Sequence, residues 1–223
     1  MLYSPKHLLF NSCILFTFAI ANAQPISKKI DLGELFKKNK LTTYNRVASL
    51  SQQGSRTAIV LNEDVEERLV LIPEINFTTG VIEIDLKGQN VFQHSFIGIA
   101  FHMLDSDNFD AIYFRPFQFL NPDSVLHARS LQYVSFPEFT WQKLREEKPG
   151  KFESPVKPIP DPDEWFHVRI VIKEKLAEIF VNDSSVPSLS VEILNKRKSG
   201  KLALYTADRS GGSFANLTII SDK

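Results

Sequence analysis

From residue 57 onward, the chain alternates between apolar and polar positions in short runs that are separated by turn residues. Successive side chains of an extended strand point to opposite faces, so this alternation predicts strands with one buried face. Short strands at such spacing are typical of an all-β sandwich or barrel. We expect strands at residues 57–62, 68–72, 80–87, 95–104, 109–117, 126–136, 165–172, 176–182, 189–194, 201–206 and 213–221.

Three segments depart from this alternation. Residues 26–41 are charged and weakly periodic, and we expect them to lead into the domain as a strand or short helix. Residues 137–147 (PEFTWQKLREE) predict a short helix, and residues 149–162 contain five prolines. Because proline cannot join a central ladder, the second stretch should be an ordered loop over one face or edge. The predicted fold is therefore an antiparallel β-sandwich with one short helical insert.

The first 23 residues have the features of a secretory leader. Lys6 and His7 precede an apolar run at residues 8–20, which ends in the small-x-small pattern Ala21-Asn22-Ala23. The run is shorter than the roughly 20 residues that span a bilayer, so we expect no membrane span. The prediction is a signal peptide at 1–23, a single domain at 24–223, and a secreted or periplasmic protein.

The composition indicates how the domain is stabilised and which class of partner it lacks. Cys13 is the only cysteine and lies in the leader, so the mature domain must be stabilised by its core without disulfides. The whole chain carries 26 Lys and Arg against 26 Asp and Glu. A strongly basic surface is typical of nucleic-acid binding, so we expect no nucleic-acid partner. Nothing in the sequence indicates an oligomeric state.

The polar faces of three consecutive predicted strands supply candidate binding residues. Sequential strands are often neighbours in a sheet, and in that case these faces would merge into one groove floored by Gly98 and Ala100. Small residues in mid-strand suggest that something approaches closely there. The groove would carry Glu83, Asp85, His102, Tyr113 and Arg115.

Such a groove suits a saccharide, because carboxylates and arginine make directional hydrogen bonds to hydroxyls. An aromatic ring can also pack against the apolar face of a sugar. Arg129, Gln132 and Tyr133 lead into the helical insert. They form a further set with Trp141 and Arg145 on that insert, where Trp141 could form an aromatic wall. The alternatives are an ordinary solvated sheet face and a Trp141 that simply packs the insert onto the sandwich.

Catalytic and metal-binding motifs are incomplete. Glu83-Ile84-Asp85 resembles the start of the Glu-x-Asp-x-x-Glu motif of glycoside hydrolase family sixteen, but Gly88 occupies the position of its third acid. Asp105, Asp107 and Asp110 could bind calcium through clustered oxygens, although aspartate is also an ordinary turn residue. The histidines lack zinc-ligand spacing, so we assign no metal site and no required cofactor.

Several segments resemble the concanavalin A-like lectin/glucanase superfamily: residues 96–102 (FIGIAFH), 113–117 (YFRPF), 165–170 (WFHVRI) and 214–219 (FANLTI), with Arg129, Gln132 and Tyr133. They are most similar to its laminin-G-like bacterial branch, near the 3-keto-disaccharide hydrolase domain family. The resemblance implies a jelly-roll sandwich whose concave sheet often binds glycan. It transfers no catalytic residue.

These observations leave three functional hypotheses. The first is a secreted protein that recognises a saccharide or polysaccharide on its concave sheet. The second is a saccharide-cleaving hydrolase or lyase in which Glu83, Asp85 or His102 acts as acid or base. The third is a structural or adhesion module that binds another protein through an outer face.

Overall fold

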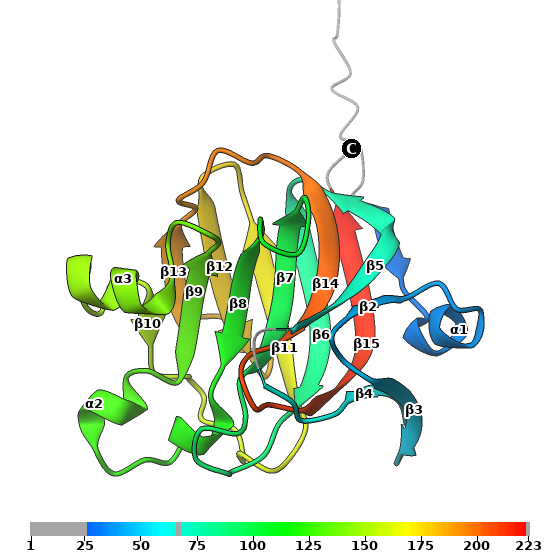
Figure 1. Cartoon of the computed structure of the whole chain (residues 1–223). Helices are drawn as coiled ribbons and strands as arrows, with labels where there is room; N and C mark the ends of the chain where they lie inside the picture. The colour runs from blue at the N-terminus through cyan, green and yellow to red at the C-terminus, as the bar shows by residue number, and fades with distance from the viewer. Residues whose placement is uncertain (1–25, 66–67, 222–223) are drawn as a thin grey trace, which may run out of the picture.

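Two antiparallel β-sheets pack face to face in the computed structural model, which describes residues 26–65 and 68–221 (Figure 1). The antiparallel sandwich expected from the alternation is thereby confirmed. The predicted leader lies outside the described residues. Among the described residues, no helix has the length and apolar character needed to cross a membrane.

Sheet A has eight strands in the order β13-β12-β11-β6-β15-β4-β3, and β1 also pairs with β15. Its strands are β1 (Ile26–Lys29), β3 (Ala48–Gln53), β4 (Arg56–Leu61), β6 (Gly80–Lys87), β11 (Phe166–Ile172), β12 (Leu176–Val181), β13 (Leu189–Glu192) and β15 (Gly212–Ser221).

Sheet B has seven strands in the order β10-β9-β8-β7-β14-β5-β2. Its strands are β2 (Thr42–Tyr44), β5 (Arg68–Phe77), β7 (Ile97–Met103), β8 (Asp110–Phe114), β9 (Leu131–Ser135), β10 (Glu153–Ser154) and β14 (Gly200–Thr206).

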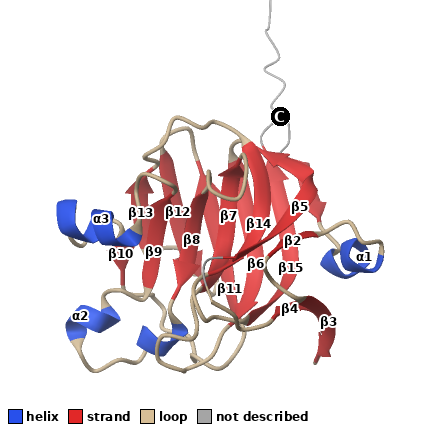
Figure 2. Cartoon of the chain, in the orientation of Figure 1, coloured by secondary structure: helices blue, strands red, loops and turns tan. Residues whose placement is uncertain are grey.

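The helices lie at the edges of the sandwich (Figure 2). They are α1 (Leu32–Lys37), α2 (Ser124–His127), α3 (Trp141–Glu147) and the 3-10 turn η1 (Pro116–Gln118). α3 is the expected insert and α1 lies in the segment expected to form a strand or short helix, whereas α2 and η1 were not expected. Residues 126–127 belong to α2 rather than to a strand, because the Asp123 carboxylate accepts hydrogen bonds from the backbone of Val125 and Leu126 and begins a helix.

The assumption that residues 80–87 lie beside residues 95–104 in one sheet is wrong. β6 pairs with β11 and β15 in sheet A, whereas β7 pairs with β8 and β14 in sheet B. Ile82 and Ile84 on β6 and Ile97 and Ile99 on β7 all belong to the buried core between the sheets. These faces meet across the core, and the polar faces of the two strands therefore point in opposite directions.

Aromatic side chains fill the core between the sheets. The ring of Phe166 on β11 lies 5.2 Å from that of Phe114 on β8 and 5.5 Å from that of Phe119. All three side chains are fully buried. Such edge-to-face pairs stabilise a core beyond the area that they bury, in keeping with a domain that has no disulfide.

The packing of neighbouring strands, rather than a ligand, requires a glycine at position 98. A Cβ atom at this position would lie 2.0 Å from the carbonyl oxygen of Ile112 and 2.6 Å from the Cα of Tyr113. The close approach anticipated from the sequence is therefore that of β8 against β7. No ligand is needed to explain the glycine.

The proline-rich segment follows the edge of the sandwich, as expected. Within it, β10 adds a two-residue strand to β9. The Ser154 hydroxyl donates to the Ser188 carbonyl at 2.7 Å, and the Lys157 amide donates to the Ser188 hydroxyl at 3.0 Å. Because Ser188 directly precedes β13, these bonds connect the edge of sheet B to sheet A. The segment also holds Glu153, which contributes to the site described next.

Candidate functional site

A pocket of about 500 Å³ lies at the end of sheet B where β8 runs into η1. This volume is within the range of small-molecule sites. The pocket is walled by the loop before β7, the end of β8, helices α2 and α3, and the loop after β14. Figure 1 shows α2 and α3 at the same edge of the molecule, beside β9 and β10.

One wall is a chain of aromatic rings. The Phe117 ring lies 5.6 Å from Phe92 and 5.3 Å from Phe96, and Phe96 lies 6.2 Å from Tyr113. The Ala207 amide donates to the Phe96 carbonyl at 3.1 Å, which joins the two loops of this wall. Phe92 is 59% exposed, so part of the apolar surface is open to solvent.

Arg115 lies beneath the rings and is only 6% exposed. Its guanidinium donates to the Arg129 carbonyl, to the Tyr113 hydroxyl at 2.8 Å and to Oε1 of Gln132 at 3.3 Å. It also lies 4.9 Å from the Tyr113 ring centroid and 5.6 Å from that of Phe96. Burial lowers the pKa of Arg115 from its usual value, since the charged form loses hydration.

Helix α3 forms the opposite wall. Thr140 caps its first turn by accepting from the Lys143 amide, and the buried Leu144 anchors the helix to the sandwich. Trp141 is 36% exposed and faces the pocket. Arg145, one turn later, lies 4.9 Å from the Trp141 ring centroid, a cation–π contact that steadies the indole.

Glu153 on β10 holds this wall in place from behind. It accepts from Arg145 Nε at 3.2 Å and Nη2 at 2.7 Å, and its Oε1 lies 3.6 Å from Nε of Arg129. The Glu153 side chain is 9% exposed, so this two-oxygen pair is shielded from solvent.

The predicted binding residues therefore separate into three places. Tyr113, Arg115, Arg129 and Trp141 line the pocket together. Gln132 lies behind it, where it accepts from Arg115 and donates to the carbonyls of Tyr133 and Phe152. A ligand-binding role for these residues stays a prediction.

Glu83 and Asp85 lie on the outer face of sheet A and do not share a groove with Tyr113 and Arg115. Asp85 is held by Arg56, His167 and Asn216, each at 2.8 Å. Burial acts to raise the pKa of Asp85, but these three hydrogen bonds outweigh it and lower the pKa to about 2. The predicted groove does not form, because β6 pairs with β11 in sheet A, where His167 stands opposite Asp85.

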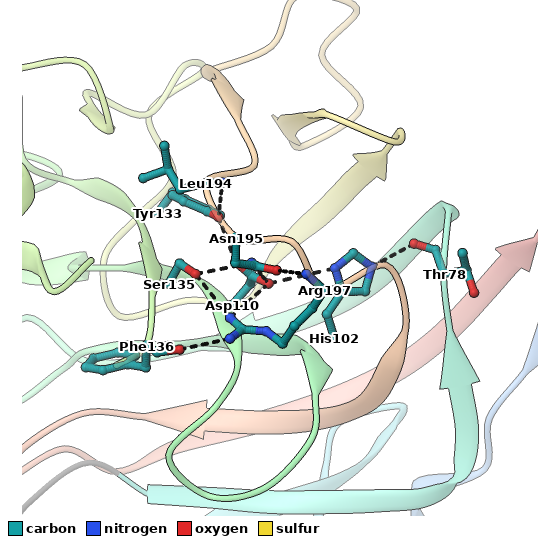
Figure 3. Close-up of polar contacts among 9 residues, drawn as sticks. All are labelled: Thr78, His102, Asp110, Tyr133, Ser135, Phe136, Leu194, Asn195 and Arg197. Atoms are coloured by element: carbon teal, nitrogen blue, oxygen red, sulfur yellow. Dashed lines mark hydrogen bonds and ion pairs between the residues drawn. The ribbon is translucent and has the colours of Figure 1, made fainter. Parts of the chain in front are cut away.

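His102 and Tyr133 belong to a buried cluster around Asp110 (Figure 3). Asp110 accepts from the Tyr133 hydroxyl at 2.6 Å and from the Asn195 amide, and its Oδ2 lies 3.4 Å from Arg197. His102 Nε2 lies 2.7 Å from the Thr78 carbonyl. Burial lowers the pKa of His102, although Asp110 acts in the opposite direction. His102, Asp110 and Tyr133 are at most 3% exposed, so we assign these residues a structural role.

The three aspartates considered for calcium do not converge. Asp105 accepts from the Asn108 side chain and the Asp107 amide within its own loop, whereas Asp110 points into the sandwich toward Arg197. The described residues contain no group of three His, Cys, Asp or Glu side chains placed to hold a metal ion.

Several pocket residues were not among the candidates. They are Phe92, Gln93, His94, Phe96, Phe117, Gln118, Leu126, Gln142, Ala207, Asp208 and Arg209. Arg145, which the sequence grouped with Trp141, also lines the pocket, because it follows Trp141 by four residues and so shares its helix face. The loop residues carry no such signal, since the β14–β15 connection reaches the pocket only through the strand order.

The Asp85–His167 pair predicts a pH-dependent stability. The lowered pKa of Asp85 gives stabilisation that is present above about pH 4 and lost as pH falls toward 2. The raised pKa of His167, caused mainly by Asp85, gives stabilisation that is present below about pH 6.5 and lost as pH rises through the folded-state value. Asp85→Asn should therefore lower the unfolding free energy most between about pH 4 and 6.5, by about 1 kcal/mol given the partial exposure of His167.

Urea denaturation across this range measures the effect, with Glu192→Gln as the control, because Glu192 is an exposed acid on β13 of the same sheet. A deficit in Asp85→Asn that stays unchanged at pH 2 would contradict the assignment.

The Asp110 cluster predicts a large stability difference between two nearby aspartates. Asp110→Ala leaves the largely buried Arg197 without its carboxylate and removes the acceptor of Tyr133 and Asn195, so it should cost about 3 kcal/mol. Asp105→Ala removes only contacts within an exposed loop and should cost about 1 kcal/mol or less. Chemical denaturation of both variants tests this, and equal losses would show that the cluster does not carry the assigned structural role.

No protein-family model and no curated protein matches this chain. Solved structures do match. The carbohydrate-binding module CBM66 from Bacillus subtilis has a TM-score of 0.58 at 12% identity, over 80% of this chain and 94% of that chain. A Bacillus subtilis protein of unknown function with a galectin-like fold has a TM-score of 0.54 at 10% identity, over 82% and 89%.

A candidate glycosyl hydrolase from Parabacteroides distasonis ATCC 8503 has a TM-score of 0.51 at 14% identity, over 88% of this chain and 100% of that chain. Identities this low establish similarity of fold alone. The chain thus has the same two-sheet sandwich fold as the CBM66 module and the Bacillus subtilis protein with a galectin-like fold.

Proposed function

We propose that this protein is a glycan-binding module that holds a saccharide in the pocket at the end of sheet B. The observation that carries the proposal is that one pocket is lined both by an open aromatic wall and by the exposed indole of Trp141. Flat aromatic surfaces pack against the apolar faces of sugar rings. The arginines between these walls supply directional donors for sugar oxygens.

The similar structures support the same conclusion at the level of fold, since one is a carbohydrate-binding module and another a candidate glycosyl hydrolase. Export from the cytoplasm, the laminin-G-like branch and nearness to the 3-keto-disaccharide hydrolase domains remain parts of the proposal that rest on the sequence. An extracellular place would expose the pocket to polysaccharide.

Binding is favoured over cleavage by the acids available. Glycoside hydrolysis ordinarily uses two carboxyl groups facing one bond. Among the described residues that line the pocket, Asp208 is the one carboxylate, and it lies 3.8 Å from Arg209 in an exposed ion pair. Glu83, Asp85 and His102, the acid–base candidates, lie outside the pocket, on sheet A and in the buried cluster.

The two tryptophans of the chain provide a matched test. Trp141 lies in the pocket, whereas Trp165 lies beneath Arg56 on the other sheet. Trp141→Ala should weaken saccharide binding at least tenfold, or about 1.4 kcal/mol, because it removes one wall. Trp165→Ala should leave affinity within about twofold, since it removes no surface of the pocket.

Calorimetric titration of neutral and acidic oligosaccharides into wild type and both variants measures this. Absence of binding to every saccharide at millimolar concentration would overturn the proposed function. Binding that is lost in Trp165→Ala but retained in Trp141→Ala would place the site on sheet A.

A further inference from the structure

Positive charge is concentrated at the pocket although the whole chain has equal numbers of basic and acidic residues. Four arginines line the pocket: Arg115, Arg129, Arg145 and Arg209. The nearby carboxylates are Asp208 at the rim, Glu153 beneath the wall and Glu63, which lies 3.7 Å from the pocket residue His94. Glu153 pairs with both Arg129 and Arg145, so the four guanidinium groups still outnumber these three carboxylates.

Arg115 is the pocket arginine whose hydrogen-bond partners are all neutral. Among the described residues, no carboxylate lies within ion-pair distance of it, and its hydrogen bonds go to a backbone carbonyl, a phenol and an amide. These bonds occupy three of the five N–H groups of the guanidinium. A buried cation without an anionic partner is costly. An anion placed in the pocket would lower this cost.

The environment of Arg115 holds the guanidinium in a fixed orientation. The Tyr113 ring lies beside it at 4.9 Å, the Gln132 amide fixes one edge, and Gln132 itself is fixed by the carbonyls of Tyr133 and Phe152 at 3.1 Å each. The cation therefore needs little reordering to meet a ligand. Such preorganisation favours binding, because the entropy of fixing the side chain has already been lost in folding.

We propose that the saccharide taken by this site is anionic, with its carboxylate or sulfate oxygens directed at Arg115 and the neighbouring Arg129 and Arg209. This inference rests on the proposed glycan-binding function and specifies its ligand class. Arginine only donates hydrogen bonds, so a pocket rich in arginine favours a ligand rich in acceptors. The planar guanidinium matches a carboxylate particularly well, since it can present two parallel N–H groups. The aromatic walls would hold the sugar ring that carries this group.

The experiment compares each acidic oligosaccharide with its neutral counterpart, by titration calorimetry of the folded chain. One arm uses oligogalacturonate against the fully methyl-esterified form, and the other uses a sulfated oligosaccharide against its desulfated form. At least one acidic form should bind tenfold or more tightly than its neutral counterpart. Added NaCl should reduce that preference, as screening predicts. The arm that binds identifies the anionic group.

Arg115→Gln, Arg129→Gln and Arg209→Gln should each reduce the preference for the acidic form, Arg115→Gln by tenfold or more. Arg209 is exposed, so Arg209→Gln keeps the test valid if Arg115→Gln does not fold. Arg169→Gln is the matched control, because Arg169 lies over the Phe180 ring on the outer face of sheet A. It should leave affinity unchanged.

Equal affinity for acidic and neutral forms would overturn this inference and leave the proposed function intact. Absence of binding to all four oligosaccharides and to neutral glycans would overturn both. Acidic binding that falls as much in Arg169→Gln as in the pocket variants would show attraction to charge in general, and would also overturn the inference.

Discussion

A buried guanidinium must be surrounded by hydrogen-bond acceptors, and one end of sheet B meets this requirement at Arg115. The residue follows β8 directly, and its own amide donates to the Ser130 carbonyl, which extends the pairing of β8 toward β9. Tyr113 and Gln132 supply side-chain acceptors from two neighbouring strands. The position of this cation therefore depends on the register of β8 and β9, in which Tyr113 stands opposite Gln132. The position of the Arg115 guanidinium in turn determines its contacts with the aromatic wall and places a positive charge at the pocket.

The nearly buried charges on the two sheets differ in their hydrogen-bond partners. On sheet A, Asp85 is an almost buried carboxylate whose three partners, Arg56, His167 and Asn216, satisfy it within the protein. On sheet B, Arg115 is an almost buried cation whose partners are all neutral. A satisfied ion pair stabilises a sheet, whereas a cation without a carboxylate beside an open pocket favours a ligand. This contrast is why sheet B, rather than the acidic face of sheet A, is the proposed binding face.

Much of the fold could be predicted from alternation alone, because inward residues such as Ile84 and Ile99 are set by the two-residue period of a strand. The antiparallel sandwich and the approximate position of every expected strand followed from this period. Strand order did not follow, since pairing partners depend on contacts across long stretches of sequence. β6 pairs with β11, about 85 residues later, through register contacts such as Ile84 with Val168.

The strand order also determines which residues of the candidate site could be predicted from the sequence. Tyr113 and Arg115 were found together because they share one strand face, and Trp141 because a short helix interrupts the strands. Glu83 and Asp85 were misplaced by the strand order, and His102 by a local irregularity. His102 has a φ of 48°, and the register of β7 against β14 shifts around it, so its side chain leaves the face of Gly98 and Ala100. Phe92 and Arg209 lie on loops whose meeting only the folded chain reveals.

Hydrogen exchange of backbone amides tests most directly whether the ligand binds at Arg115. It is measured with and without a saturating amount of oligogalacturonate or of the sulfated oligosaccharide, whichever binds. We expect added protection in the loop before β7, at residues 115–118, in α3 and at residues 207–209, with residues 53–56, 83–85 and 167–169 unchanged. Protection concentrated at the Asp85 face of sheet A, or no change at any amide, would contradict it.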